Sequence, residues 1–145
     1  MARDQKLDEV TEGLLQLYPL LFRKLHARMV LSTLEMMRFR ILKILMIEGP
    51  LPISEIGTRL FVSRPYMTKL IDGLIAEGHA ERRPDEKDRR VLIISITDAG
   101  REWFGKTRGR LKDQVGELIS KLEEGDVRDL SHALGTIRKV LEKIT

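Results

Sequence analysis

The chain has 145 residues, 42% of them hydrophobic, which is enough for one folded domain with a real core. The formal net charge is +4, and the absence of cysteine excludes disulfides, thiolate metal sites and cysteine-based redox sensing. No apolar run approaches the ~20 residues of a membrane span, and no continuous apolar segment marks a secretory signal. We therefore expect a cytoplasmic protein without membrane contact.

Residues 4–28 are predicted to form a helix, because apolar residues recur at three- and four-residue spacing from Leu7 to Leu25. Pro19 lies in the middle of this stretch, where proline removes a backbone donor and clashes with the preceding turn. We expect a kink there, or two helices that meet at Tyr18. The apolar stripe is broader than one intrachain contact needs, which favours a second copy of the chain as an additional partner.

A second helix is predicted to follow, capped by Ser32 or Thr33, with Glu35 near its positive end. Apolar residues surround this helix on nearly all sides, which predicts that it is buried. Gly49 and Pro50 are expected to end it.

The next stretch predicts a short edge strand at Leu51–Ile53 and then two helices joined by a tight turn. Ser54 is expected to cap the first of these helices and Ser63 the second, where Pro65 falls in the first turn. One face of the second helix is predicted to be buried, and it consists of Met67, Leu70, Ile71 and Leu74.

Residues 79–84 and 91–97 are predicted to form two strands joined by a polar hairpin loop. A long helix is expected from Thr97-Asp98 to a break at Glu124-Gly125. A last helix follows, capped by Asp126, with Asp129 completing a capping box. The apolar stripes of these last helices are typical of helix-on-helix packing.

The two helices joined by a tight turn form a predicted helix-turn-helix, whose second helix can enter a major groove. The exposed residues of its first turns can meet base edges or phosphates, and they are Ser63, Arg64, Tyr66, Thr68 and Lys69. Ser54 adds a hydroxyl at the start of the preceding helix. Eight of the 26 Lys and Arg lie between Arg59 and Arg90, about a fifth of the chain, which suits a phosphate surface. An ordinary solvated surface helix is the alternative.

The hairpin predicts a second nucleic-acid contact, because basic residues lead into it and crowd its tip. These residues are Arg82, Arg83, Lys87, Arg89 and Arg90. A narrow minor groove attracts inserted arginine side chains. Asp88 would be repelled by phosphate, so we expect it to pair with Arg90 and hold that side chain extended. A solvated charged turn is the alternative.

The order and spacing of these elements resemble the MarR family of winged helix-turn-helix transcription regulators, from roughly Leu7 to Ile144. The resemblance is carried by Ile53–Gly57, Ser63–Leu74 with Glu77-Gly78, Arg83–Asp85 with Asp88–Arg90, and Ile96–Gly100. It implies a homodimer on a pseudo-palindromic operator, with Arg90 in a minor groove and Asp88 as its positioning partner. It also implies release of DNA by a small aromatic acid or phenol.

The resemblance places an effector pocket where the terminal helices meet the winged region, with Arg40 as the cation for an aromatic acid. The predicted lining residues are Tyr18, Phe22, His26, Met36, Phe39, Arg40 and Trp103. A place in the core or in the dimer interface is the alternative for each of them.

Gly100–Thr107 matches the phosphate-loop pattern G-x-x-x-x-G-K-[ST], so a small nucleotide-binding enzyme has to be considered. We reject this reading because Trp103 and Phe104 would have to leave the core, and because the chain lacks repeated strand–helix–strand units. The three histidines share no metal-ligand spacing. We predict no enzyme, no cofactor and no metal site.

The expected fold class is mainly α with a small β-wing, in a single domain over residues 1–145. A winged helix-turn-helix spans residues 32–97, and dimerisation helices span 4–28 and 98–145. The predicted function is a DNA-binding transcription regulator, a repressor acting as a homodimer, with double-stranded DNA as its partner. Two alternatives stay open, an architectural protein that binds DNA non-specifically and a protein-interaction winged helix.

Overall fold

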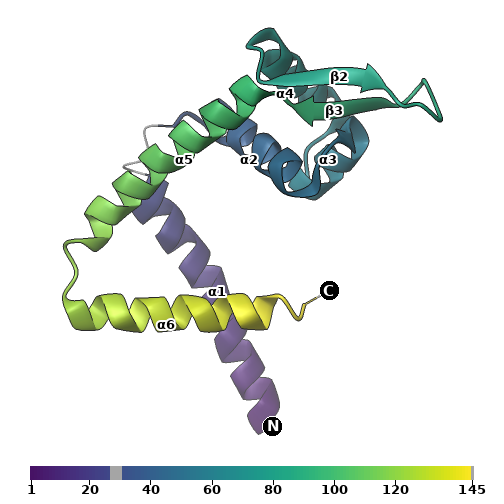
Figure 1. The fold of residues 1–145 in the computed structure, drawn as a ribbon. Helices are drawn as coiled ribbons and strands as arrows, with labels where there is room; N and C mark the ends of the chain where they lie inside the picture. Colours follow the sequence, from purple (N-terminus) through teal and green to yellow (C-terminus); the bar gives the residue numbers. More distant parts are fainter. Residues whose placement is uncertain (27–30, 145) are drawn as a thin grey trace. The chain divides into compact units, whose positions relative to one another are not determined.

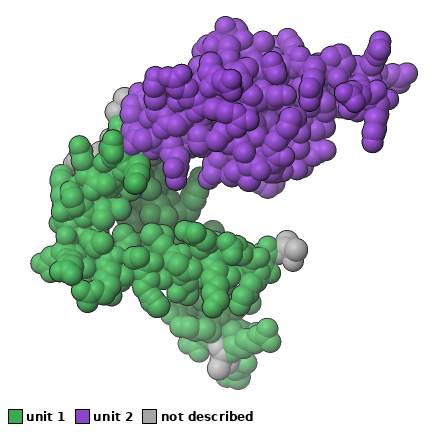
Figure 2. Space-filling model, viewed as in Figure 1, with its two compact units in different colours: residues 1–28, 111–145 green, residues 29–110 purple. Residues whose placement is uncertain are grey.

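The computed structural model describes residues 1–26 and 31–144, and those ranges contain six helices and a three-stranded sheet (Figure 1). The chain divides into two compact units (Figure 2). Residues 29–110 form one, called here the winged unit, and residues 1–28 with 111–145 form the other, called the terminal unit. The predicted class, mainly α with a small β-wing, is confirmed.

The winged unit contains three complete helices, the sheet and the start of a long helix. Its elements are α2 (Thr33–Glu48), β1 (Leu51–Pro52), α3 (Ile53–Leu60), α4 (Arg64–Ala76), β2 (Ala80–Pro84), β3 (Leu92–Ile96) and the first part of α5 (Asp98–Ile119). The sheet is antiparallel in the order β1-β3-β2, which confirms that β1 is an edge strand. The pairing of Ala80 with Ile96 and of Pro84 with Leu92 sets the register of the wing.

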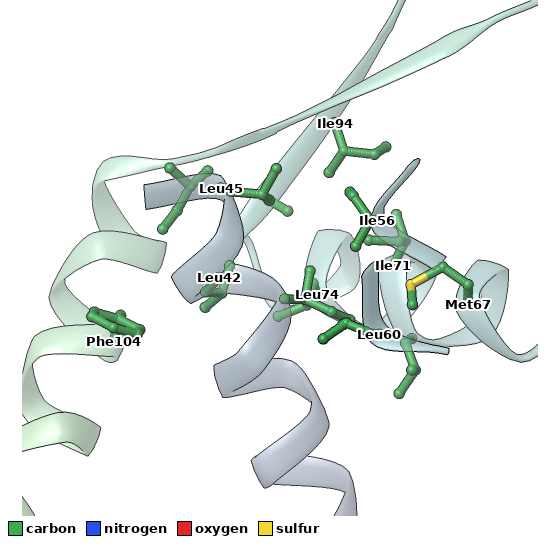
Figure 3. Packing of buried hydrophobic residues seen from close by; sticks show 13 residues of the cluster. Leu42, Leu45, Ile56, Leu60, Met67, Ile71, Leu74, Ile94 and Phe104 are labelled. Carbon is green, nitrogen blue, oxygen red and sulfur yellow. The ribbon is translucent and has the colours of Figure 1, made fainter. Parts of the chain in front are cut away.

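A single apolar core holds the helix-turn-helix against the sheet. Figure 3 shows α2, α3, α4 and β3 contributing side chains to it. The periodicity of α4 predicted its buried face correctly, since Met67, Leu70, Ile71 and Leu74 are each at most 1% exposed. The fully buried Ile94 joins the wing to the same core. The core therefore fixes the outer face of α4 relative to the base of the wing.

Of the two predicted caps of α2, Ser32 is the one used, and it forms a capping box with Glu35. Ser32 is the N-cap, its hydroxyl accepts a hydrogen bond from the Glu35 backbone N–H at 3.2 Å, and the Glu35 carboxylate accepts one from the Ser32 backbone N–H at 2.8 Å. Hydrogen bonds from the backbone and side chain of Ser32 lower the pKa of Glu35 from its ordinary 4.5. Gly49 ends the helix with φ 81°, as expected for a glycine stop. The expectation of burial on nearly all sides is wrong, because Ile47 is 72% exposed and only one face packs on the core.

Ser32→Ala is expected to lower the free energy of unfolding by about 1 kcal/mol, because it leaves a helix-end N–H without its side-chain acceptor. Since the folded-state pKa of Glu35 is lowered, the contribution of its carboxylate is present above pH 4.5 and lost as the pH falls through the lowered value. Urea denaturation at neutral and acidic pH measures both effects. Thr33→Ala is the control, because Ser32 and not Thr33 occupies the N-cap. An equal loss in both variants would contradict this assignment.

The start of α3 differs from the prediction. The helix begins at Ile53, with Pro52 as the N-cap and no side-chain cap, so Ser54 lies in the first turn and caps nothing. Proline fixes φ near the value of an extended residue, here −60° with ψ 144°, and it can therefore precede a helix directly. Ile53 accordingly belongs to α3 and not to the edge strand.

The terminal unit contains α1 (Ala2–His26), the end of α5 and α6 (Glu124–Leu141). Helix α1 continues through Pro19, so the alternative of two helices meeting at Tyr18 is wrong. The predicted break at Glu124-Gly125 is also wrong, because α6 begins there. Glu123 is the N-cap of α6, so Asp126 lies in the first turn and Asp129 completes no capping box. Acidic residues suit any position near a helix start, which is why the sequence misplaced this boundary.

Candidate nucleic-acid interface

The outer face of α4 carries the residues expected at the groove. Arg64, Tyr66 and Lys69 are exposed, while Thr68 is half-buried and donates its hydroxyl proton to the Arg64 carbonyl at 3.0 Å. Ser63 occupies the N-cap position as predicted, but its side chain makes no capping hydrogen bond. Helix α4 therefore presents polar and cationic groups on the side opposite its core face.

The turn at the tip of the wing is held by its own backbone. The Asp85 N–H donates to the Val91 carbonyl and the Val91 N–H donates to the Asp88 carbonyl, both at 2.9 Å. The Asp88 carboxylate accepts the backbone N–H of Arg90 at 3.0 Å, a turn typical of aspartate. The expected pairing of Asp88 with the Arg90 side chain is absent from the described residues, so Asp88 positions the backbone that carries Arg90.

Side chains from both parts of the motif converge on one hollow of about 210 Å³. Arg64 and Thr68 come from α4, Arg82 from β2, Arg90 from the wing loop and Ser54 from the first turn of α3. Three arginines and two hydroxyls thus share one concavity whose lining contains no carboxylate. Such a lining suits a chain of phosphates.

The predicted basic residues do not all share this hollow. Arg83 and Lys87 line a second hollow of about 360 Å³, together with Asp85 and Glu86, whose negative charges offset theirs. Neighbouring residues of a strand point to opposite faces, which separates Arg83 from Arg82. Arg89, like Arg90, is exposed in the wing loop. The structure thus brings Arg64, Arg82 and Arg90 together and leaves Arg83 and Lys87 apart.

The three arginines differ in their partners. The Arg82 guanidinium lies 3.0 Å from the Asp72 carboxylate, an ion pair that joins the wing strand to α4. Within the described residues, no ion pair occupies the guanidinium of Arg64 or Arg90. Sequence reasoning missed the role of Asp72, because its pairing with Arg82 depends on the packing of a helix against a strand.

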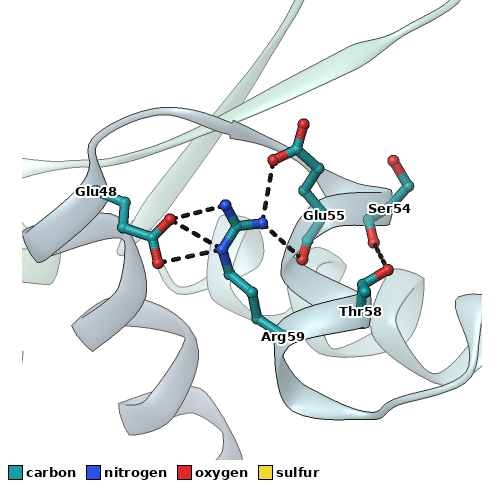
Figure 4. A network of polar contacts seen from close by, with 5 residues as sticks. All are labelled: Glu48, Ser54, Glu55, Thr58 and Arg59. Carbon is teal, nitrogen blue, oxygen red and sulfur yellow. Dashed lines mark hydrogen bonds and ion pairs between the residues drawn. The ribbon is translucent and has the colours of Figure 1, made fainter. Parts of the chain in front are cut away.

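Arg59 belongs to the basic stretch in sequence but is neutralised in the fold. Its guanidinium lies 2.8 Å from the Glu48 carboxylate and 3.0 Å from that of Glu55 (Figure 4). The hydrogen bonds with Glu48, and then those with Glu55, raise the pKa of Arg59. This network attaches α3 to the end of α2, so Arg59 supports the helix-turn-helix from behind.

The sequence model of the MarR family matches residues 32–91, the stretch that forms the helix-turn-helix and most of the wing. This stretch of the chain is similar to the MarR family. Members of this family are DNA-binding winged-helix regulators of transcription, and the resemblance stated from the sequence is confirmed.

Two curated MarR-like relatives and one solved structure illustrate the similarity. BadR, a transcriptional activatory protein of Rhodopseudomonas palustris, is 26% identical over 99 residues, which are 68% of this chain and 55% of BadR. TtmR, an HTH-type transcriptional regulator of Methylorubrum extorquens, is 39% identical over 69 residues, which are 48% of this chain and 35% of TtmR. The matched stretches thus span about half or less of these curated relatives.

The transcriptional regulator BldR from Sulfolobus solfataricus has a similar solved structure, with a TM-score of 0.66 and 29% identity over 99% of both chains. These MarR-like relatives are transcription regulators and not enzymes, as expected for this chain. The phosphate-loop match at Gly100–Thr107 is helical throughout in α5, with Phe104 in the core. No helix in the described part of the chain is long and apolar enough to cross a membrane. The described residues also contain no cluster of three or more His, Cys, Asp or Glu suited to a metal ion.

The predicted effector residues divide between the two units. Tyr18 and Phe22 belong to the terminal unit, where their rings stack at 6.5 Å. In the winged unit, the Phe39 ring stacks on Phe104 at 4.6 Å and Trp103 packs against the core, which accounts for both as structural residues. The winged unit also contains Met36 and Arg40. The side chain of His26 lies outside the described residues. The effector pocket stays a prediction.

Proposed function

We propose that this chain is a regulator of the MarR family that binds a pseudo-palindromic operator as a homodimer and represses transcription from it. The observation that carries the proposal is the single hollow shared by Arg64, Arg82 and Arg90. It allows α4 to lie in a major groove while the wing follows the adjacent backbone into a minor groove. The protein would meet such an operator in the cytoplasm, so the proposal agrees with the location predicted from the sequence.

The terminal unit supports the dimer. Helix α6 buries none of its residues, and Leu134 on it is 51% exposed. On α1, Leu7 and Leu15 are each 64% exposed and Tyr18 is 73% exposed. Large apolar patches of this kind usually mark an interface, and a twofold dimer is the simplest way to cover them. Light scattering that gave the mass of one chain at micromolar concentration would refute this part of the proposal.

Selection of genomic fragments bound by the purified protein tests the operator. We expect enrichment of a sequence with two inverted half-sites about one helical turn apart. Competition with scrambled DNA then separates a regulator from an architectural protein, because a specific site is typically at least 10³-fold tighter. Equal competition by scrambled DNA would favour the architectural alternative, and no salt-dependent binding would favour a protein-interaction module. We also propose that a small aromatic acid or phenol releases the protein from its operator. Titration of the protein–DNA complex with such compounds tests this part of the proposal.

Lys69→Ala is expected to weaken binding to operator and scrambled DNA by similar factors, because Lys69 lies outside the hollow and suits a phosphate contact. The slope of log affinity against log salt should fall in magnitude by about 0.9 for each lysine lost. Fluorescence anisotropy at several salt concentrations measures both quantities. A loss confined to the operator would instead make Lys69 a base contact.

A further inference from the structure

Phe61 lies in the turn between α3 and α4, and the packing of the fold does not explain why this position holds a phenylalanine. Its side chain is 96% exposed, so it contributes little to the core. Its backbone has φ 54° and ψ 42°, and no other non-glycine residue in the described ranges has a positive φ. A left-handed conformation is unfavourable for an aromatic residue, and glycine is the usual choice there. Neither burial nor backbone conformation accounts for a phenylalanine.

The backbone of this turn is held in place. The Phe61 N–H donates to the Thr58 carbonyl at 3.3 Å, and the Val62 N–H donates to the Gly57 carbonyl at 3.0 Å. A Cβ on Gly57 would lie 3.2 Å from the Val62 carbonyl oxygen, so the glycine permits this close approach. The Phe61 ring is therefore carried into solvent by a constrained turn immediately before α4.

A mostly apolar hollow of about 410 Å³ lies beside the ring. Phe61, Val62 and Met67 contribute to its lining. Ser54 and Arg64 also line it, and they line the basic hollow as well, so the two concavities are neighbours. No wing residue lines the hollow beside Phe61. The apolar surface thus continues the proposed DNA surface along α3 and the start of α4.

We propose that Phe61 contacts the 5-methyl group of a thymine in each operator half-site. This inference rests on the proposed function. The thymine methyl is the apolar group that DNA presents in the major groove, and apolar side chains recognise it. The first residues of a recognition helix contact base edges in the groove, and Phe61 lies in the turn that leads directly into the first residue of α4, Arg64. Phe61 then adds a preference for thymine that Arg64 and the wing arginines do not supply.

Deoxyuridine in place of thymine tests the proposal, because it removes only the methyl group. Wild-type binding to the unmodified operator first tests the proposed function by itself. Each pair of symmetry-related thymines is then replaced in turn. At one pair we expect wild-type affinity to fall about fourfold for each half-site, the value of one buried methyl group. Phe61→Ala should bind the modified and unmodified operators equally.

Ile47→Ala is the matched control, because Ile47 is an apolar residue near the end of α2, 72% exposed, that lines neither hollow. It should keep the wild-type response to the same thymine pair. If Phe61→Ala retains the methyl response, or if wild type shows none at any thymine, the proposal is wrong. An equal loss on both operators with the methyl response intact would indicate a sugar or phosphate contact and would also overturn it.

Phe61→Gly separates this role from a structural one. Glycine adopts the left-handed conformation freely, so we expect the thermal midpoint to stay the same or rise by about 2–4 °C while the methyl response is lost. A clear fall in the midpoint of Phe61→Gly would show that the ring supports the fold, and would overturn the proposal.

Discussion

Arg90→Ala is expected to lower operator affinity at least tenfold, about 1.4 kcal/mol, while the winged unit stays folded. Arg90 is exposed, lines the basic hollow and has no ion pair within the described residues, so its removal costs the fold little. In the complex, the lost guanidinium would have entered a narrow minor groove, where the negative potential is enhanced. Anisotropy titration gives the affinity, and circular dichroism checks the fold.

Lys87→Ala is the matched control for Arg90→Ala, because it removes one positive charge from the same loop. Lys87 lines the other hollow, beside Asp85 and Glu86, and its charge is already offset there. We expect less than a threefold change in operator affinity, the scale of a screened surface charge. If the two variants lost affinity equally, net charge and not the position of Arg90 would govern binding, and the wing assignment would fail.

Gly100→Ala is expected to lower the free energy of unfolding by about 2 kcal/mol or more. A Cβ on Gly100 would overlap the backbone carbonyl oxygen of His79 and approach Ile96 to 2.9 Å. The same carbonyl accepts the Thr97 N–H at 3.1 Å, so a methyl group there would separate the start of α5 from the strand that begins the wing. Because the obstacle is backbone, side-chain rotation cannot relieve it. Urea denaturation followed by circular dichroism measures the loss.

Gly105→Ala provides the comparison within the same helix. A Cβ on Gly105 meets nothing within 4 Å, and alanine favours a helix over glycine by about 1 kcal/mol. This variant should therefore be as stable as wild type or more so. Two variants of identical chemistry are then expected to move stability in opposite directions. A stable Gly100→Ala protein would mean that α5 does not begin against His79.

The sequence predicted the core of the winged unit well, because periodicity reports burial directly. All four apolar residues assigned to the inner face of α4 are buried, and the hairpin lies within a residue or two of its predicted bounds. The first residues of helices were harder to predict, because several neighbouring residues can serve as the N-cap. Pro52 could serve as an N-cap as well as Ser54, and Glu123 as well as Asp126, because helix starts tolerate many residues.

The membership of the candidate site stays a prediction, and the structure shows which of the predicted residues lie together. Arg64, Thr68, Arg82 and Arg90 were all expected at the interface, and they do meet. Arg83 could not be separated from Arg82 until the strand and its faces were known. The exposure and left-handed backbone of Phe61 also have no sequence signal, since a hydrophobic residue between two helices usually indicates packing.

The ion pair of Asp72 with Arg82 has a consequence for how tightly the protein holds any DNA. In the absence of DNA, the Asp72 carboxylate occupies a guanidinium that a phosphate would otherwise bind. A phosphate must compete with that internal anion, so Arg82 gains less from random DNA than Arg64 or Arg90, which have no such partner. Asp72 is therefore expected to act as an internal competitor that lowers the contribution of Arg82 to the affinity for any DNA.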